Sequence, residues 1–198
     1  MKTATTTLLS PPKKHDPDFG GRPRRINLEQ TVAIRGHGKL KVRPIRLDDE
    51  QEMIRFHAQL SEESIYLRYF EYLGLDRRTS HERLVQVCIN RPESYALVAE
   101  LLPEGDRPAE IMAVGRLTKT LYPHAAGFET LIADEAHART IRSILLGRLV
   151  TFAHAFGFHI LIGDLLAADH DTLNLCRKMG FSLQTLPENS LVRVMIDL

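Results

Sequence analysis

Hydrophobic residues repeat along the chain with two different periods, and the change from one period to the other predicts a mixed α/β domain. Alternating or continuously apolar runs predict strands. We expect strands at 30–46 (a hairpin), 94–102, 109–118, 126–133, 158–166, 181–186 and 190–198. Apolar residues spaced three and four apart predict helices. We expect these at 47–61, 61–73, 79–90, 135–156 and 169–181. This order predicts a sheet with antiparallel and parallel parts.

Turn and capping residues mark several of these boundaries. Gly36 and Gly38 supply the turn of the first hairpin. Asp48 is the expected N-cap of the first helix, and Asp169 is the expected N-cap of the last one. Gly180 is positioned to end that last helix.

The beginning of the chain differs in composition from the rest. Its PPKKHDPDFGGRPRR stretch is rich in proline, glycine and charge and nearly free of aliphatic residues. We therefore expect a disordered or extended tail over residues 1–27 and one domain over residues 28–198. The basic residues of the tail could contact a nucleic acid or a partner, or simply be solvated. They are Lys13, Lys14, Arg22, Arg24 and Arg25.

Charge and apolar content argue against several function classes. The 198 residues carry a net charge of +1, so no global field favours nucleic acid or an anionic membrane. No apolar run reaches the roughly 18 residues of a membrane helix. Cys88 and Cys176 stand far apart in helical patterns, which favours reduced thiols and a cytoplasmic protein. No metal site is expected, because His154 and His159 would not share a helix face.

Two stretches of the sequence carry a family resemblance. VRPIRLDDEQEMIRFHAQLSEESIYLRYF and LLAADHDTLNLCRKMGF resemble the Gcn5-related N-acetyltransferase (GNAT) superfamily, most closely the domain that ends bacterial protein-lysine acetyltransferases. The resemblance covers about residues 28–198. It implies the GNAT-like acyl-CoA N-acyltransferase fold and transfer of an acetyl group from acetyl-CoA to a primary amine. The acceptor would be a protein lysine or a small amine. The resemblance leaves open whether the protein forms a homodimer.

The same resemblance implies where acetyl-CoA would bind. The backbone of Leu131 and Ala133 would hold the pantetheine arm at a splayed central strand, and the following helix start would bind the diphosphate. The family's phosphate motif, Q/R-x-x-G-x-G/A, falls on His137, Thr140 and Arg142, and none of the three matches it. If the Arg142 side chain turns outward, the backbone amides at the helix start stay accessible to the diphosphate. If it turns inward, it fills the cradle, which is the space that the diphosphate would occupy. The expected cofactor residues at this junction are Ala138, Arg139, Thr140, Ile141, Arg142 and Ser143.

Deprotonation of the acceptor amine needs a carboxylate near the acetyl group. The resemblance implies a glutamate on the central strand, where this chain has Gly127. Glu129 lies two residues on, on the same face unless a β-bulge intervenes, so it is the candidate base or an ordinary ion-paired carboxylate. Glu100 and Glu110 are weaker candidates. Cys176 replaces the acidic tyrosine of many relatives and is expected to be a packing residue.

Two functions therefore stay open from sequence alone. One is an acetyl-CoA-dependent N-acetyltransferase. The other is a catalytically degenerate GNAT-fold binding or regulatory module whose CoA site is weakened or lost.

Overall fold

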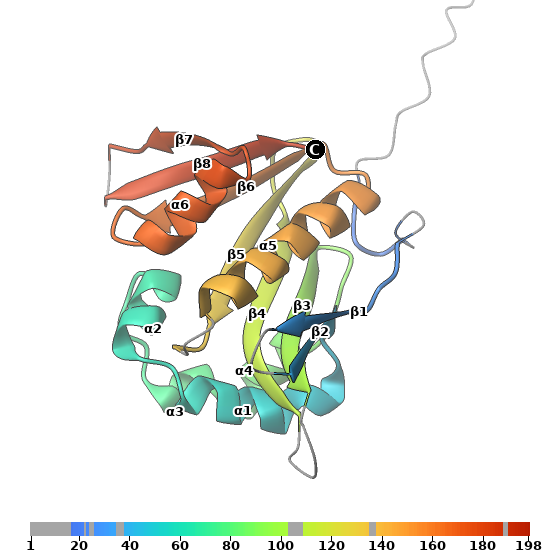
Figure 1. Cartoon of the computed structure of the whole chain (residues 1–198), viewed down its shortest axis with the longest axis vertical. Coiled ribbons are helices and arrows are strands. Elements are labelled where there is room, and N and C mark those ends of the chain that lie inside the picture. The colour runs from blue at the N-terminus through green and yellow to red at the C-terminus, as the bar shows by residue number, and fades with distance from the viewer. Residues whose placement is uncertain are drawn as a thin grey trace, which may run out of the picture.

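The computed structural model describes residues 17–21, 23, 26–34, 38–102, 109–134, 138–187 and 190–198. Within these segments the strands form one mixed sheet in the order β1-β2-β3-β4-β5-β6-β8-β7 (Figure 1). Only β5 and β6 run parallel to each other, and the other neighbouring pairs are antiparallel. The strands are β1 (Gln30–Ile34), β2 (Gly38–Pro44), β3 (Ser94–Leu102), β4 (Glu110–Lys119), β5 (Ala125–Ile132), β6 (Ile160–Leu166), β7 (Ser182–Thr185) and β8 (Leu191–Asp197).

Helices cover both faces of this sheet (Figure 1). On one face Leu145 and Leu149 press against Gly115 of β4, where an added Cβ would lie 2.8 Å from Leu149. On the opposite face Arg116, the next residue of β4, donates a hydrogen bond to the Val87 carbonyl. The helical elements are η1 (Leu47–Asp49), α1 (Glu50–Ala58), α2 (Glu62–Tyr69), α3 (Leu75–Arg78), α4 (His81–Val87), α5 (Ala138–Ala155) and α6 (His170–Lys178).

The sheet opens at its centre, between β5 and β6. These strands pair over only three positions, Ala125–Gly127 against Ile160–Ile162. On its other side β5 stays paired with β4 as far as Ile132. Beyond Gly127 the two strands diverge toward α2 and α6 (Figure 1). The expected splayed central strand is therefore present, and one edge of β5 faces a gap.

The expected elements match the structure closely, with two differences at the start of the domain. The first helix is capped by Asp49 rather than Asp48, because residues 47–49 form a separate 3-10 turn. Asp49 holds that turn by accepting hydrogen bonds from the Arg46 amide at 2.7 Å and from Arg43 Nη1 at 2.8 Å. The short helix α3 was not expected at all. Gly36 lies outside the described residues, so its place in the turn stays a prediction.

Part of the expected tail packs into the core. Phe19 is only 5% exposed, and its ring centroid lies 6.1, 5.1 and 4.9 Å from those of Tyr95, Phe156 and Phe158. Its amide donates to the Pro92 carbonyl at 2.8 Å. The segment expected to be a disordered or extended tail is therefore anchored to the domain at residue 19, since one aromatic ring supplies the burial that the aliphatic residues do not. The basic residues of the expected tail lie outside the described residues: Lys13, Lys14, Arg22, Arg24 and Arg25.

The burial of Phe19 predicts a measurable loss of stability. Phe19→Ala should lower the free energy of unfolding by about 3 kcal/mol, the low end for a buried phenylalanine. For a chain of this size that corresponds to a drop of roughly 6–12 °C in Tm in a thermal melt. Leu28→Ala, at a 42% exposed position, is the control and should change little. A Phe19→Ala protein that melts with the wild type would show that the segment contributes no stability.

Candidate functional site

A cavity of about 550 Å³ lies where β5 and β6 separate. Residues of α2, β5 and β6 form most of its wall, and Arg142 of α5 and Asp169 at the start of α6 complete it. This volume is in the usual range for a small-molecule or cofactor site. The unpaired edge of β5 lies along it, so backbone hydrogen-bonding groups are available to a bound ligand.

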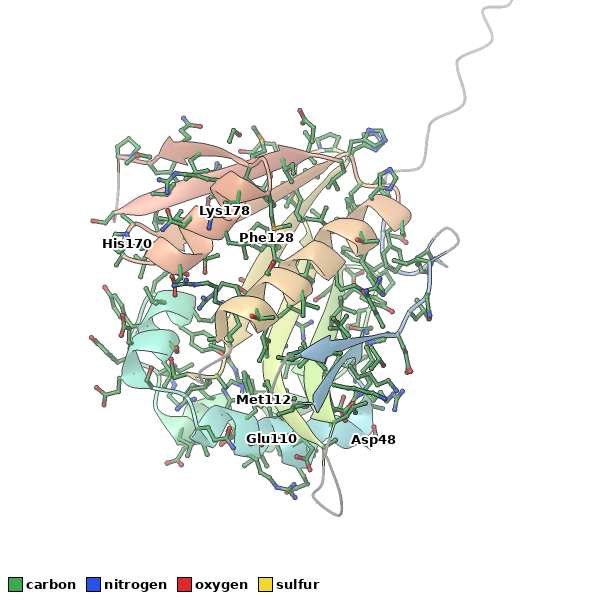
Figure 2. All side chains as sticks on the ribbon, viewed as in Figure 1. Asp48, Glu110, Met112, Phe128, His170 and Lys178 are labelled. Atoms are coloured by element: carbon green, nitrogen blue, oxygen red, sulfur yellow. The ribbon has the colours of Figure 1, made fainter. Side chains whose placement is uncertain are left out.

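A glycine–phenylalanine contact accompanies the separation of the two strands. Phe128 of β5 is 3% exposed, and its ring lies where a side chain at Gly163 of β6 would stand. A Cβ built on Gly163 would come within 2.5 Å of that ring. Phe128 lies in the region between α5 and α6, and its ring packs edge-on against Phe181 at 5.8 Å (Figure 2). The ring therefore fills the face of the sheet behind the cavity.

The register of β5 corrects the expected pantetheine contacts by one residue. The Ala133 amide donates to the Met112 carbonyl at 2.9 Å, so it points to β4 and away from the gap. Backbone groups alternate between the two edges of a strand, which places those of Leu131 on the β4 side as well. The groups that face the gap belong to Phe128, Thr130 and Ile132.

Helix α5 begins at Ala138, directly after the end of the gap. The N–H groups of Arg142 and Ser143 lie within the helix, bonded to carbonyls four residues earlier, whereas the first-turn amides have no intrahelical partner. Among the described residues of the expected phosphate site, the first-turn amides are therefore those of Ala138, Arg139 and Thr140. His137 lies outside the described residues.

The side chain of Arg142 turns into the cavity. Its side chain is 16% exposed, and its Nε and Nη1 atoms are buried without a hydrogen-bond partner. Among the described residues, only Asp171 of α6 has a carboxylate oxygen within ion-pair distance, 3.5 Å from Nη1, which is long for a hydrogen bond. The Arg142 side chain therefore lines the cavity rather than extending into solvent.

Arginine in the first turn of a helix is electrostatically unfavourable. The first turn of α5 contains no acidic residue, and Arg139 adds positive charge to the positive end of the helix dipole, with Arg142 about one turn further along the helix. Asp171 lies 3.6 Å from Arg139 and offsets part of this charge, but it is itself 55% exposed. An anion at the start of α5 would therefore be attracted by the helix and by both guanidinium groups.

The loop after β5 is tied to the start of α2. Asp134 accepts hydrogen bonds from the Ser61 amide at 2.7 Å and from Ser64 Oγ at 2.6 Å. Burial alone would raise the pKa of Asp134, but these hydrogen bonds and the charge of Arg142 outweigh burial and lower it. The ionised carboxylate thus holds α2 against the mouth of the cavity.

Glu129 is the carboxylate of β5 that lines the cavity. The pairing of β4 with β5 is regular, because the one register shift of β4 lies on its other side, between Ala99 and Glu100 of β3. Glu129 therefore shares a face with Gly127, as alternation predicts. It accepts a hydrogen bond from Arg68 of α2, and its side chain remains 47% exposed.

The weaker acid–base candidates are engaged elsewhere. Glu100 pairs with Arg43 at 3.0 Å, and Glu110 accepts from Gln59 Nε2 at 2.5 Å. Neither lines the cavity. Cys176 is fully buried, and burial raises the pKa of its thiol to about 12. Asp169 caps α6 by accepting from the Thr172 amide at 3.0 Å.

Several cavity residues escaped the sequence analysis. Arg68 and Tyr69 belong to the LSEESIYLRYF stretch that carried the family resemblance, and Tyr122 precedes β5. On β6, Asp164 accepts two hydrogen bonds from Arg193 of β8, both at 2.8 Å. Only Arg68 and Tyr69 had a sequence signal, because their stretch carries the family resemblance.

Comparisons with known proteins, by sequence and by structure, find acetyltransferases. No family model matches the chain. A Pseudomonas aeruginosa acetyltransferase is 25% identical over 150 residues, which are 75% of this chain and 78% of the relative. The GNAT domain of S. lividans PAT superposes with a TM-score of 0.73 at 24% identity, over 86% of this chain and 97% of that domain. Spermidine N-acetyltransferase from Vibrio cholerae, solved with CoA and spermine, gives 0.62 at 18% identity over 80% and 95%.

In the described part of the chain, no helix is long and apolar enough to cross a bilayer. The same residues contain no cluster of three histidine, cysteine or carboxylate side chains that could hold a metal ion. The mixed sheet, the separation of β5 from β6 and the superpositions give one conclusion: the chain has the fold of the GNAT acetyltransferases.

Proposed function

We propose that the protein is an acetyl-CoA-dependent N-acetyltransferase acting on a primary amine. The observation that carries the proposal is the open edge of β5 along a 550 Å³ cavity that ends at the start of α5. A strand edge and a helix N-terminus are suited to an amide-bearing arm and a phosphate group, respectively. The acetyltransferase names of the sequence relative and of the structural neighbours support acyl transfer.

The residues present fit such a co-substrate. The gap-facing backbone groups of Phe128, Thr130 and Ile132 would bond the amides of the pantetheine arm. The first-turn amides of Ala138, Arg139 and Thr140 would receive the diphosphate. The buried, unpartnered nitrogens of Arg142 would add charge-assisted hydrogen bonds to the same group.

The chemistry requires one proton transfer and one stabilised oxyanion. Glu129 would accept the proton of the ammonium, directly or through one water, before the amine attacks the thioester. A gap-facing N–H of β5 would donate to the carbonyl oxygen as negative charge develops on it. Acetyl-CoA supplies the activated acyl group, and both protein groups lie along the same cavity.

One observation favours a second function, a binding or regulatory module without catalysis. Arg142 occupies the position of a small motif residue, and its guanidinium lies 3.5 Å from Asp171 on the neighbouring helix. A lasting contact between Arg142 and Asp171 would keep the diphosphate out of the start of α5. The fold would then serve to bind a partner.

Direct titration of the purified protein with acetyl-CoA separates the two functions. We expect saturable binding with a Kd in the micromolar range, measured by calorimetry, followed by transfer to at least one primary amine. CoA should compete with acetyl-CoA for the same site. Absence of binding at millimolar acetyl-CoA would reject the transferase and favour the module.

A further inference from the structure

A second, smaller cavity of about 70 Å³ shares a wall with the main one. Arg68, Tyr69, Glu129 and Leu131 line both cavities. The smaller cavity lies on the face of the sheet that carries α1 and α4. We call it the arginine recess and define it by the polar side chains that line it: His57, Arg68, Tyr69, Arg83, Arg116 and Glu129.

The charges of the arginine recess do not balance. Glu129 is the one carboxylate among its lining residues, and its partner is Arg68. Arg83 lies over the ring of Tyr69 at 5.3 Å and has no carboxylate within ion-pair distance among the described residues. The half-buried Arg116 donates to two neutral oxygens, Ser94 Oγ at 2.6 Å and the Val87 carbonyl.

The remaining neighbours add positive charge or none. Burial, followed by the charges of Arg78, Arg83 and Arg68, lowers the pKa of His57 to about 4, so its ring is neutral at neutral pH. Arg78 lies behind that ring, and its Nη1 and Nε donate to the carbonyls of His57 and Leu73 at 2.7 and 2.8 Å. Burial also lowers the pKa of Arg116, and the charge of Glu129 opposes this shift in part. Cations without counter-ions in a partly buried site are costly, and a bound anion would relieve this cost.

We propose that the arginine recess binds the carboxylate of the acceptor, so that the acceptor is a small amine of the amino-acid class. This inference rests on the proposed acetyl transfer. Guanidinium groups recognise a carboxylate through paired hydrogen bonds, and Arg83 and Arg116 are the two lining arginines with no carboxylate within ion-pair distance among the described residues. A volume of 70 Å³ suits an anionic group of this size and excludes a large one, since a liquid water occupies about 30 Å³.

The positions of Glu129 and Arg116 suit such a molecule. The two residues are direct partners in the β4–β5 ladder. Partners of this kind have Cα atoms about 5 Å apart. An amine beside Glu129 would therefore have its carboxylate a few bonds away, within the recess. A lysine side chain of a protein carries no carboxylate next to its amine and would leave the arginines unpaired.

Matched acceptors test this inference. Glycine, β-alanine and 4-aminobutyrate are compared with their carboxamides, with kcat/KM expressed per unprotonated amine. We expect the wild type to favour at least one carboxylate over its amide by roughly 10- to 100-fold. Arg83→Gln should reduce that ratio toward unity. The exposed Arg77, which lines neither cavity, provides the control variant Arg77→Gln, and this variant should keep the ratio.

A binding measurement without acetyl-CoA separates the recess from the proposed activity. N-acetylglycine carries the carboxylate and no free amine, and we expect it to bind the wild type roughly 10-fold tighter than Arg83→Gln. If transfer occurs and amides serve as well as carboxylates, the recess proposal is wrong and acetyl transfer stands. If no amine is acetylated but N-acetylglycine binds through Arg83, the recess stands and the proposed activity fails. Equal affinity of N-acetylglycine for the wild type and for Arg83→Gln would overturn the proposal that the recess binds a carboxylate.

Discussion

Glu129→Gln should lower the turnover of acetyl transfer by about 10²- to 10⁴-fold at neutral pH, the usual range for loss of a positioned base. Glutamine keeps the size and polarity of the side chain but cannot accept the ammonium proton. The affinity for acetyl-CoA should barely change, because backbone groups and Arg142 would hold the co-substrate. Steady-state kinetics with an amine acceptor, beside acetyl-CoA titration, measures both quantities.

The pH dependence distinguishes proton transfer from other effects of this substitution. A base is needed only while the acceptor amine is protonated, so the defect of Glu129→Gln should shrink as the pH rises toward the amine's own pKa. Glu71→Gln, at an exposed position outside both cavities, is the matched control. Normal turnover of Glu129→Gln at neutral pH would leave Glu129 as the ion-pair partner of Arg68 only.

Most of the fold could be predicted because its elements are long and strongly patterned. The 18 residues of α5 keep a continuous apolar stripe, and β6 is an almost uninterrupted apolar run. Hydrophobic patterns of this kind are strong sequence signals for a helix and for a buried strand. Helix α3 has only four residues, Leu75–Arg78, which is little more than one turn and too short to show a period.

Phe19 was missed for a different reason. It is one aromatic residue in a proline- and glycine-rich stretch, and its burial depends on rings from β3 and from the region after α5. Nothing in its local sequence shows these distant partners. Composition correctly describes the stretch as poor in aliphatic residues but does not exclude a single anchoring side chain.

The candidate site was predicted only in part, because side-chain alternation and backbone pairing are separate pieces of information. The sequence pattern correctly put Glu129 on the face of Gly127. It could not tell which edge of β5 the amides face, and the contacts expected at Leu131 and Ala133 were displaced by one residue for that reason. The Ala133–Met112 hydrogen bond settles the phase of the strand.

The arginine recess could not be predicted from the sequence, for a related reason. Arg68, Arg83 and Arg116 come from α2, α4 and β4, and only the fold brings them to one recess. In sequence they lie far apart, and none belongs to a recognisable motif of positive charge. The excess of positive charge becomes visible only when their hydrogen-bond partners are known.

Arg142→Gln should weaken the binding of acetyl-CoA by about 10- to 100-fold. The buried Nε and Nη1 atoms of Arg142 have no hydrogen-bond partner, so a diphosphate at the start of α5 would supply one. A hydrogen bond to a charged group contributes about 1.5–3 kcal/mol, which corresponds to that change in Kd. Calorimetric titration of the variant and the wild type measures the difference.

Two matched variants show whether the guanidinium binds or obstructs. Arg139→Gln removes the neighbouring first-turn arginine, whose side chain is 86% exposed, and should change the affinity far less than Arg142→Gln. Asp171→Asn removes the carboxylate 3.5 Å from Arg142 and should tighten binding, because that carboxylate no longer competes with the diphosphate for the guanidinium. The melting temperature of Arg142→Gln should stay level or rise, since the substitution removes a cation whose buried Nε and Nη1 atoms have no hydrogen-bond partner. Tighter acetyl-CoA binding by Arg142→Gln would mean that the side chain fills the cradle, and the module without catalysis would then be the better account of this fold.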